Sequence, residues 1–171
     1  MKALSIKNPY AEQILLGNKT IEYRSWTPPQ QIKQFLLVSS GTPSDTEFGL
    51  YFAHGYALAI VNIDRVSAKQ NSDGNYQWHV STAVPVEPFQ VKGKLHFYDV
   101  DDDLIKPRTD LLESMTAFAA GEEATAGDLF VDEYYKPLVE IAAKQLPKKY
   151  SKILNDNHGD WSPVIDAWMD D

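Results

Sequence analysis

Cysteine is absent from the sequence of 171 residues, which excludes disulfide bonds and metal sites built from thiolates. Histidine is scarce, and its four copies lie too far apart in the chain to show the close spacing of metal ligands. They are His54, His79, His96 and His158. We therefore expect neither a metal site nor a cofactor.

Long hydrophobic runs are absent as well. No stretch approaches the ~20 apolar residues that a membrane-spanning helix needs, and the N-terminal MKALSIKNPY has no apolar run of the kind found in a signal peptide. We expect a cytoplasmic protein that does not associate with membranes. Hydrophobic residues still make up 43% of the chain and aromatic residues 12%, which is enough for a packed core.

Basic residues are in deficit, and the deficit is confined to one part of the chain. The net charge of −8, taken alone, argues against a protein that binds nucleic acid. Residues 1–100 contain nine Lys/Arg and eight Asp/Glu, whereas residues 101–171 contain seven and sixteen. This asymmetry indicates two parts with different roles. We expect a domain over residues 1–100 and an acidic helical extension over residues 101–171 that packs on it.

The pattern of apolar residues changes at the same boundary. Before it, alternating or β-branched segments between Gly/Pro turns predict six strands. These are Ala3–Ile6, Thr20–Trp26, Phe35–Ser39, Tyr56–Val66, Tyr76–Val80 and Val91–Val100. Asn8 and Pro9 predict the cap and the first position of one helix, which ends near Gly17. After the boundary, helical spacing predicts helices at Leu111–Ala120, Tyr134–Gln145, Tyr150–Asn155 and Trp161–Met169.

These elements together predict an α+β fold that is mainly β. Many short strands joined by turns are typical of a small barrel, here with about six strands, one N-terminal helix and a C-terminal helical extension. The segment AVPVEPF is expected to be an extended connector. The extension is rich in aromatic residues, so we expect it to bury part of them against the barrel with its carboxylates outward. A lid over a binding site is the alternative.

The strand predicted at residues 20–26 gathers charged and aromatic side chains. Alternation places Glu22, Arg24 and Trp26 on one face, and Lys19 lies where the preceding helix meets the strand. One interpretation is a solvated ion pair between Glu22 and Arg24, with Trp26 at the edge of the core. The other is a ligand site, because cations hold a phosphate and an aromatic face stacks a base. Local spacing leaves both interpretations open.

The segment ALSIKNPYAEQILLGNKTIEYRSW resembles the opening of the ASCH (activating signal cointegrator homology) family, which belongs to the PUA-like superfamily. The family pattern is an apolar strand, an x-Pro-aromatic-Ala helix start, and then G-x-K-x-x-E-x-R-x-W. The similarity continues through FLLVSSGTPS and ALAIVNIDRV to the closing V-K-G segment, and it covers about residues 2–100. The matching residues are Ser5, Lys7, Pro9, Tyr10, Ala11, Gly17, Lys19, Glu22, Arg24 and Trp26.

This resemblance implies a small β-barrel with a cleft beside the first helix, floored by the strand of Lys19, Glu22 and Arg24. Similar proteins are regarded as modules that bind RNA or other nucleic acid, and some have ribonuclease activity. A compact branch removes acyl groups from acetylated cytidine with a threonine nucleophile. Glu22 occupies that threonine's position here, so the deacylase mechanism does not carry over whole.

Other residues are weaker candidates for the same cleft. The hydroxyls of Ser39 and Ser40 and the amides of their loop suit a phosphate, although an ordinary Ser-Gly turn explains them equally well. Trp78 either stacks a base or belongs to the core face of its strand. Lys92 and Lys94 either extend a positive rim or lie on a solvated strand.

Three functional hypotheses follow. In the first, the protein binds RNA, single-stranded nucleic acid or a nucleotide, including a modified nucleotide. Lys7, Lys19 and Arg24 then hold phosphate, and Trp26 or Trp78 contacts the base. Glu22 orients one of the cations or accepts a hydrogen bond from a base edge or sugar. The near-neutral charge of residues 1–100 favours a small or single-stranded ligand over a duplex, since duplex affinity depends on many phosphate contacts.

In the second hypothesis the protein is an enzyme, either a weak ribonuclease or a nucleoside amidohydrolase. Lys19 and Glu22 would then act as an acid–base pair. In the third it is an interaction module whose acidic helices bind a protein partner. The sequence identifies neither the ligand nor the oligomeric state.

Overall fold

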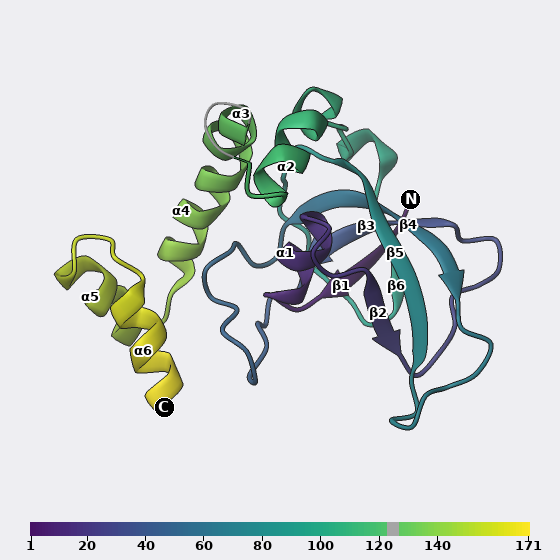
Figure 1. Cartoon of the computed structure of the whole chain (residues 1–171), viewed down its shortest axis with the longest axis horizontal. Coiled ribbons are helices and arrows are strands. Elements are labelled where there is room, and N and C mark those ends of the chain that lie inside the picture. The colour runs from purple at the N-terminus through teal and green to yellow at the C-terminus, as the bar shows by residue number, and fades with distance from the viewer. Residues whose placement is uncertain (123–126) are drawn as a thin grey trace.

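The computed structural model describes residues 1–122 and 127–171. Its six strands form one sheet in the order β2-β5-β4-β3-β1-β6. The strands are β1 (Lys2–Ile6), β2 (Ile21–Arg24), β3 (Gln34–Ser39), β4 (Ala57–Val66), β5 (Tyr76–Pro85) and β6 (Phe97–Asp99). Only the β1–β3 pair is parallel among the pairs of this sheet. The sheet curls into a half-barrel around α1 (Tyr10–Leu15) (Figure 1). The expected α+β fold with a helical C-terminal part is confirmed, and its β character is concentrated in residues 1–100.

Side chains close the seam between the two edges of the sheet. The Trp26 ring, just after β2, lies 5.5 Å from the Phe97 ring of β6. The Trp78 ring of β5 stacks on Phe97 at 5.9 Å. Arg24 Nη2 donates a hydrogen bond of 3.2 Å to the carbonyl oxygen of Ser5 on β1. Aromatic packing and one guanidinium therefore hold together edges that no strand ladder joins in the described residues.

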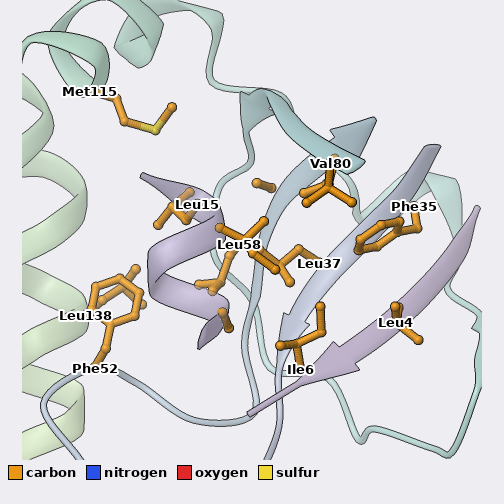
Figure 2. Packing of buried hydrophobic residues seen from close by; sticks show 14 of the residues in the cluster. Leu4, Ile6, Leu15, Phe35, Leu37, Phe52, Leu58, Val80, Met115 and Leu138 are labelled. Carbon is orange, nitrogen blue, oxygen red and sulfur yellow. The ribbon is translucent and has the colours of Figure 1, made fainter. Parts of the chain in front are cut away.

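The core lies between the sheet and α1. The apolar positions of α1 predicted from helical spacing, Ala11, Ile14 and Leu15, are buried. They belong to one buried cluster with side chains of the sheet such as Leu37 and Leu58. Figure 2 shows Leu15 of α1 next to Leu58. This contact fixes α1 against β3, β4 and β5, and the chain continues from α1 through residues 16–20 into β2.

The predicted cap of this helix is wrong. Asn8 makes no capping bond, and α1 begins after Pro9. The Asn8 side chain is instead fully buried and donates hydrogen bonds of 3.0 Å to the carbonyl oxygens of Phe52 and Ala53. A buried amide group needs partners wherever they are available, and here the loop after β3 supplies them.

Two strand boundaries also differ from the sequence prediction. Strand β5 runs on to Pro85 through the expected connector, because its ladder with β4 continues past Val80 to Pro85. Conversely, the strand expected over residues 91–100 forms only at β6, and residues 91–96 are irregular. Gly93 is packed closely against Ser5, because a Cβ atom added to Gly93 would lie 2.6 Å from the Ser5 Oγ. His96 has a φ of 57°, a left-handed conformation that does not fit a regular strand. The chain therefore crosses the seam as an irregular segment and begins to pair with β1 only at Phe97.

The helices predicted after residue 100 are present, with ends shifted by a few residues. They are α2 (Leu112–Ala119), α4 (Lys136–Gln145), α5 (Lys148–Asp156) and α6 (Ser162–Asp170). A short helix α3 (Asp128–Phe130) and a π-helical turn (Val131–Tyr135) lead directly into α4. In Figure 1, α2 lies against the half-barrel, whereas α5 and α6 lie farther from it. Among the described residues, no helix is long and apolar enough to cross a membrane.

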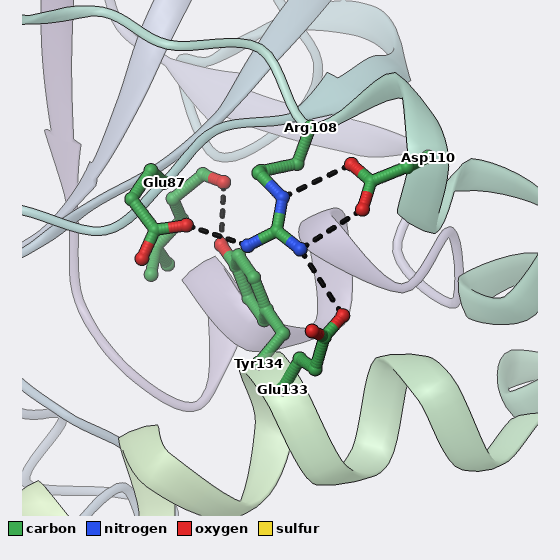
Figure 3. A network of polar contacts seen from close by, with 6 residues as sticks. Glu87, Arg108, Asp110, Glu133 and Tyr134 are labelled. Carbon is green, nitrogen blue, oxygen red and sulfur yellow. Dashed lines mark hydrogen bonds and ion pairs between the residues drawn. The ribbon is translucent and has the colours of Figure 1, made fainter.

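The first of these helices share a core with the half-barrel. One buried cluster contains residues of α1 and the sheet together with Leu111, Met115, Phe130, Tyr134 and Leu138. The Tyr134 hydroxyl donates a hydrogen bond of 2.5 Å to the Leu58 carbonyl oxygen. Beside it, Arg108 pairs with Glu87, Asp110 and Glu133 at 2.6 to 3.2 Å (Figure 3). The division of the chain at residue 100 stays a prediction.

A half-buried carboxylate at this contact predicts a dependence of stability on pH. Glu12 of α1 accepts a hydrogen bond of 2.5 Å from the Tyr135 hydroxyl. Burial raises the pKa of Glu12 above its ordinary value of 4.5, although the Tyr135 bond lowers it in part. The folded protein then binds this proton more tightly than the unfolded chain. The stability that Glu12 contributes is present below pH 4.5 and is lost as the pH rises through the folded pKa.

Glu12→Gln removes this titration while keeping an oxygen for Tyr135. We expect the unfolding free energy of the wild type, relative to Glu12→Gln, to fall between pH 4 and pH 7, measured by urea denaturation. Glu140→Gln removes the same charge from an exposed position on α4 and controls for net charge. A wild-type-minus-variant difference that stays constant with pH would contradict the assignment.

Candidate functional site

A cleft of about 920 Å³ opens over the seam of the half-barrel. Its walls come from β2, the end of β1, the first residue of α1, the loop after β3 and the irregular segment 91–96. The lining residues are Ser5, Ile6, Lys7, Tyr10, Glu22, Tyr23, Arg24, Ser25, Trp26, Ser40, Gly41, Thr42, Asn75, Val91, Lys92, Gly93, Lys94, Leu95 and His96. Curling of the sheet therefore brings together five separate parts of the sequence, namely residues 5–10, 22–26, 40–42, 75 and 91–96.

The charge of this cleft is opposite to that of the whole chain. Lys7, Arg24, Lys92 and Lys94 line it, and Glu22 is the one carboxylate among its lining residues. The three lysines are exposed. Of the described residues after residue 100 (101–122 and 127–171), none contributes to the lining. The cleft consequently offers an anion a locally positive environment despite the net charge of −8.

Arg24 is held rigidly at the floor of the cleft. Its Nη2 is tied to the Ser5 carbonyl oxygen across the seam, and its Nε lies 3.7 Å from Glu22 Oε1. The side chain is 24% exposed. Because a guanidinium has five N–H donors in a fixed plane, these contacts leave donors for a ligand. An arginine anchored in this way is preorganised for an anion or a planar polar group.

Glu22 is the most unusual group of the cleft, since carboxylates are rarely buried. The residue is only 8% exposed. Its Oε1 accepts a hydrogen bond of 3.1 Å from the Tyr23 backbone N–H. Burial raises the pKa of Glu22, and the positive charges of Arg24 and Lys19 counteract the rise in part. A buried carboxylate with a perturbed pKa at the floor of a cleft is a candidate functional group.

Aromatic rings line the cleft beside these charges. Trp26 is half-buried, with its ring 5.0 Å from Trp78 and 4.7 Å from His96. Tyr10 and Tyr23 add two further rings to the lining. Such rings can stack on a nucleobase, because every base has a π-face.

The remaining sequence candidates lie in three different environments. Ser40 lines the cleft, and its Oγ accepts a 3.3 Å hydrogen bond from the Thr42 N–H. Lys19 is not among the lining residues: its Nζ donates to the Ile21 carbonyl oxygen and lies over the rings of Tyr10 and Tyr23, at 5.6 and 5.2 Å. Lys19 thus makes cation–π contacts with two rings of the cleft lining, those of Tyr10 and Tyr23.

Ser39 and Trp78 are fully buried. The Ser39 hydroxyl donates a 2.7 Å hydrogen bond to the Ala53 carbonyl oxygen. The indole Nε1 of Trp78 donates to the Trp26 carbonyl oxygen at 3.2 Å. Neither side chain reaches the cleft, because each is engaged within the core, and we leave both out of the ligand set proposed below.

Local sequence patterns do not identify several of the lining residues. Helical spacing and the family pattern assign Tyr10 to the start of a helix, and alternation along the strand places Tyr23 on the face opposite Glu22. His96 is one of four widely spaced histidines. Its position depends on the irregular path of residues 91–96, which alternation along a strand does not predict. Among the described residues, no three His, Asp or Glu side chains gather into a set that could hold a metal ion.

Comparison with known proteins identifies the family of the chain. The family model of the ASCH domain matches residues 4–92, which is more than half of the chain and includes β2 and the loop after β3. A search of curated proteins finds no match.

Proposed function

We propose that the chain, which belongs to the ASCH domain family, binds single-stranded RNA or a nucleotide in the cleft over β2. Domains of this family are generally regarded as RNA-binding domains of the PUA-like kind. One observation carries the proposal: four cationic side chains and an accessible tryptophan line a single cleft of about 920 Å³.

The proposed arrangement divides the ligand between two kinds of side chain. Lys7, Lys92, Lys94 and Arg24 hold phosphate, and the Trp26 ring contacts a base. No ion pair within the described residues engages Lys7 or Lys92, so binding phosphate breaks no existing contact of theirs. Four cations match only a few phosphates, which favours a short single strand over a long duplex.

Substitution of Arg24 by lysine tests the phosphate role. We expect Arg24→Lys to weaken binding of a short single-stranded RNA by ~1–3 kcal/mol, because an ammonium group cannot form the bidentate hydrogen bonds that a guanidinium forms with a phosphate. Affinity is measured by fluorescence anisotropy at low and moderate salt, and the wild type should lose affinity as salt rises.

Two controls separate binding from stability. Arg24 also bonds Ser5, so the thermal unfolding of the variant is measured alongside. Arg65→Lys makes the same change at an exposed position of β4 outside the cleft and should leave binding unaffected. An affinity that responds neither to Arg24→Lys nor to salt would remove the phosphate role.

The two other hypotheses have less support. A hydrolase that uses Lys19 and Glu22 needs both groups at one reacting atom, but the Lys19 amine is engaged by the Ile21 carbonyl oxygen. For the third hypothesis, no contact among the described residues points to a protein partner of the acidic helices. We therefore do not adopt either as the function of the chain.

A further inference from the structure

Two neighbouring residues of the cleft each carry a buried polar atom with no hydrogen-bond partner in residues 1–122 and 127–171. These atoms are Oε2 of Glu22 and Nε of Arg24. Most buried polar atoms in native proteins are hydrogen-bonded, because an unpaired one destabilises the folded state. The packing of the described residues gives neither atom a hydrogen-bond partner, and both residues line the cleft.

The surrounding contacts keep these two atoms in place. The Glu22 side chain is only 10% exposed, and its other oxygen accepts the Tyr23 N–H. The Arg24 guanidinium is tied to Ser5 through Nη2, and its Nε lies 3.7 Å from Glu22 Oε1. The result is one fixed acceptor next to one fixed donor.

A ligand group that complements this pair must present a donor next to an acceptor. A phosphate offers acceptors only. The Watson–Crick edge of an unpaired base offers both, since an N–H group lies beside a ring nitrogen or a carbonyl oxygen. A ribose hydroxyl also donates and accepts. The rings of Trp26 and Tyr10 in the same cleft favour the base, because they provide a surface on which it can stack.

We propose that Glu22 and Arg24 recognise the Watson–Crick edge of one unpaired base, with Oε2 accepting its N–H and Nε–H donating to the adjacent acceptor. This inference rests on the proposed function, in which cations at the rim hold the phosphates of the same strand. It makes the cleft selective for single strands, since a duplex occupies these edges by base pairing.

The test uses RNA hexamers that carry one base at the centre of an otherwise abasic backbone. Each of the standard bases is compared in two forms, with its edge N–H intact and with every hydrogen of that N–H or NH2 group replaced by methyl. Affinities are measured by fluorescence anisotropy. For at least one base we expect the intact form to bind the wild type ~10-fold or more tightly than the methylated form, as for a hydrogen bond to a charged group.

Glu22→Gln keeps the shape of the side chain but loses the charge of the acceptor. We expect it to reduce the ratio between intact and methylated forms to about threefold or less. Glu140→Gln makes the same exchange on the exposed surface of α4 and should leave the ratio unchanged. The comparison of methylated and intact bases on the wild type stands even if Glu22→Gln does not fold.

Each other outcome overturns the proposal in a recognisable way. If intact and methylated forms bind alike and binding weakens with salt, the cleft binds phosphate but does not recognise the base edge. If methylation has no effect while a DNA hexamer binds more weakly than RNA, the pair recognises the ribose hydroxyl. If no hexamer binds even at low salt, the proposed function itself fails.

Discussion

Truncation after Val100 should yield a protein that aggregates or is unfolded at 25 °C, whereas truncation after Gln145 should leave a folded protein. The shorter product lacks Leu111, Met115, Phe130, Tyr134 and Leu138, which share one buried cluster with α1 and the sheet. Burial of such side chains contributes about 1.5–3 kcal/mol each. Their combined loss is therefore comparable to the whole stability of a typical domain, roughly 5–15 kcal/mol.

The longer product provides the matched comparison. It retains all five of these side chains, and it loses α5 and α6, which form a separate buried cluster with Leu50. Solubility, circular dichroism and urea unfolding distinguish the two products. A soluble product of residues 1–100 with unchanged stability would show that the helices are an independent unit. A soluble product that binds RNA more tightly than the full chain would instead support a lid.

Phe130→Ala is expected to destabilise the full chain by about 3–5 kcal/mol, the usual cost of removing a fully buried phenylalanine. The Phe130 ring is inaccessible to solvent and lies 5.1 Å from the Tyr134 ring and 5.6 Å from the Phe118 ring. Its removal leaves a cavity at the point where α3 and α4 meet α2 and the half-barrel.

Leu129→Ala is the control for this substitution. Leu129 is the preceding residue of α3 and is 46% exposed, so its truncation should change stability by about 0.5 kcal/mol or less. Urea unfolding followed by tryptophan fluorescence gives both values. Equal effects of the two substitutions would contradict the packing of Phe130 in the shared core.

The strands and helices could be predicted largely from the sequence because each depends on short-range patterns. Alternation identified the strand that contains Glu22 and Arg24, and helical spacing identified α1 and the larger helices after residue 100. Predictions failed where a distant contact overrides the local pattern. Asn8 bonds to Phe52 and Ala53 instead of capping α1, and the ladder with β4 extends β5 through the proline-rich connector.

The sequence predicted the kinds of side chain in the candidate site better than it predicted which individual residues line it. The cations and tryptophan around β2 are visible as residue types in one segment, and the matched family pattern lies over the same residues. Trp78 and Ser39 looked equally suitable as types, but both are buried. The sequence patterns do not single out Tyr10 or His96 as ligand-binding residues, yet both line the cleft.

By itself, then, the sequence determined the family, the α+β fold with its helical extension, and the presence of cations and aromatic rings near β2. The family follows from the resemblance of its motifs, whereas the fold and the residue types follow from composition and from periodicity over a few residues. Only the tertiary structure decided which side chains line the cleft and that it is positive within an acidic chain. The physical reason is that the cleft exists only where the sheet curls and Arg24 reaches Ser5, while Trp26 meets Phe97. Such contacts join residues far apart in the chain, and no local pattern encodes which of them will meet.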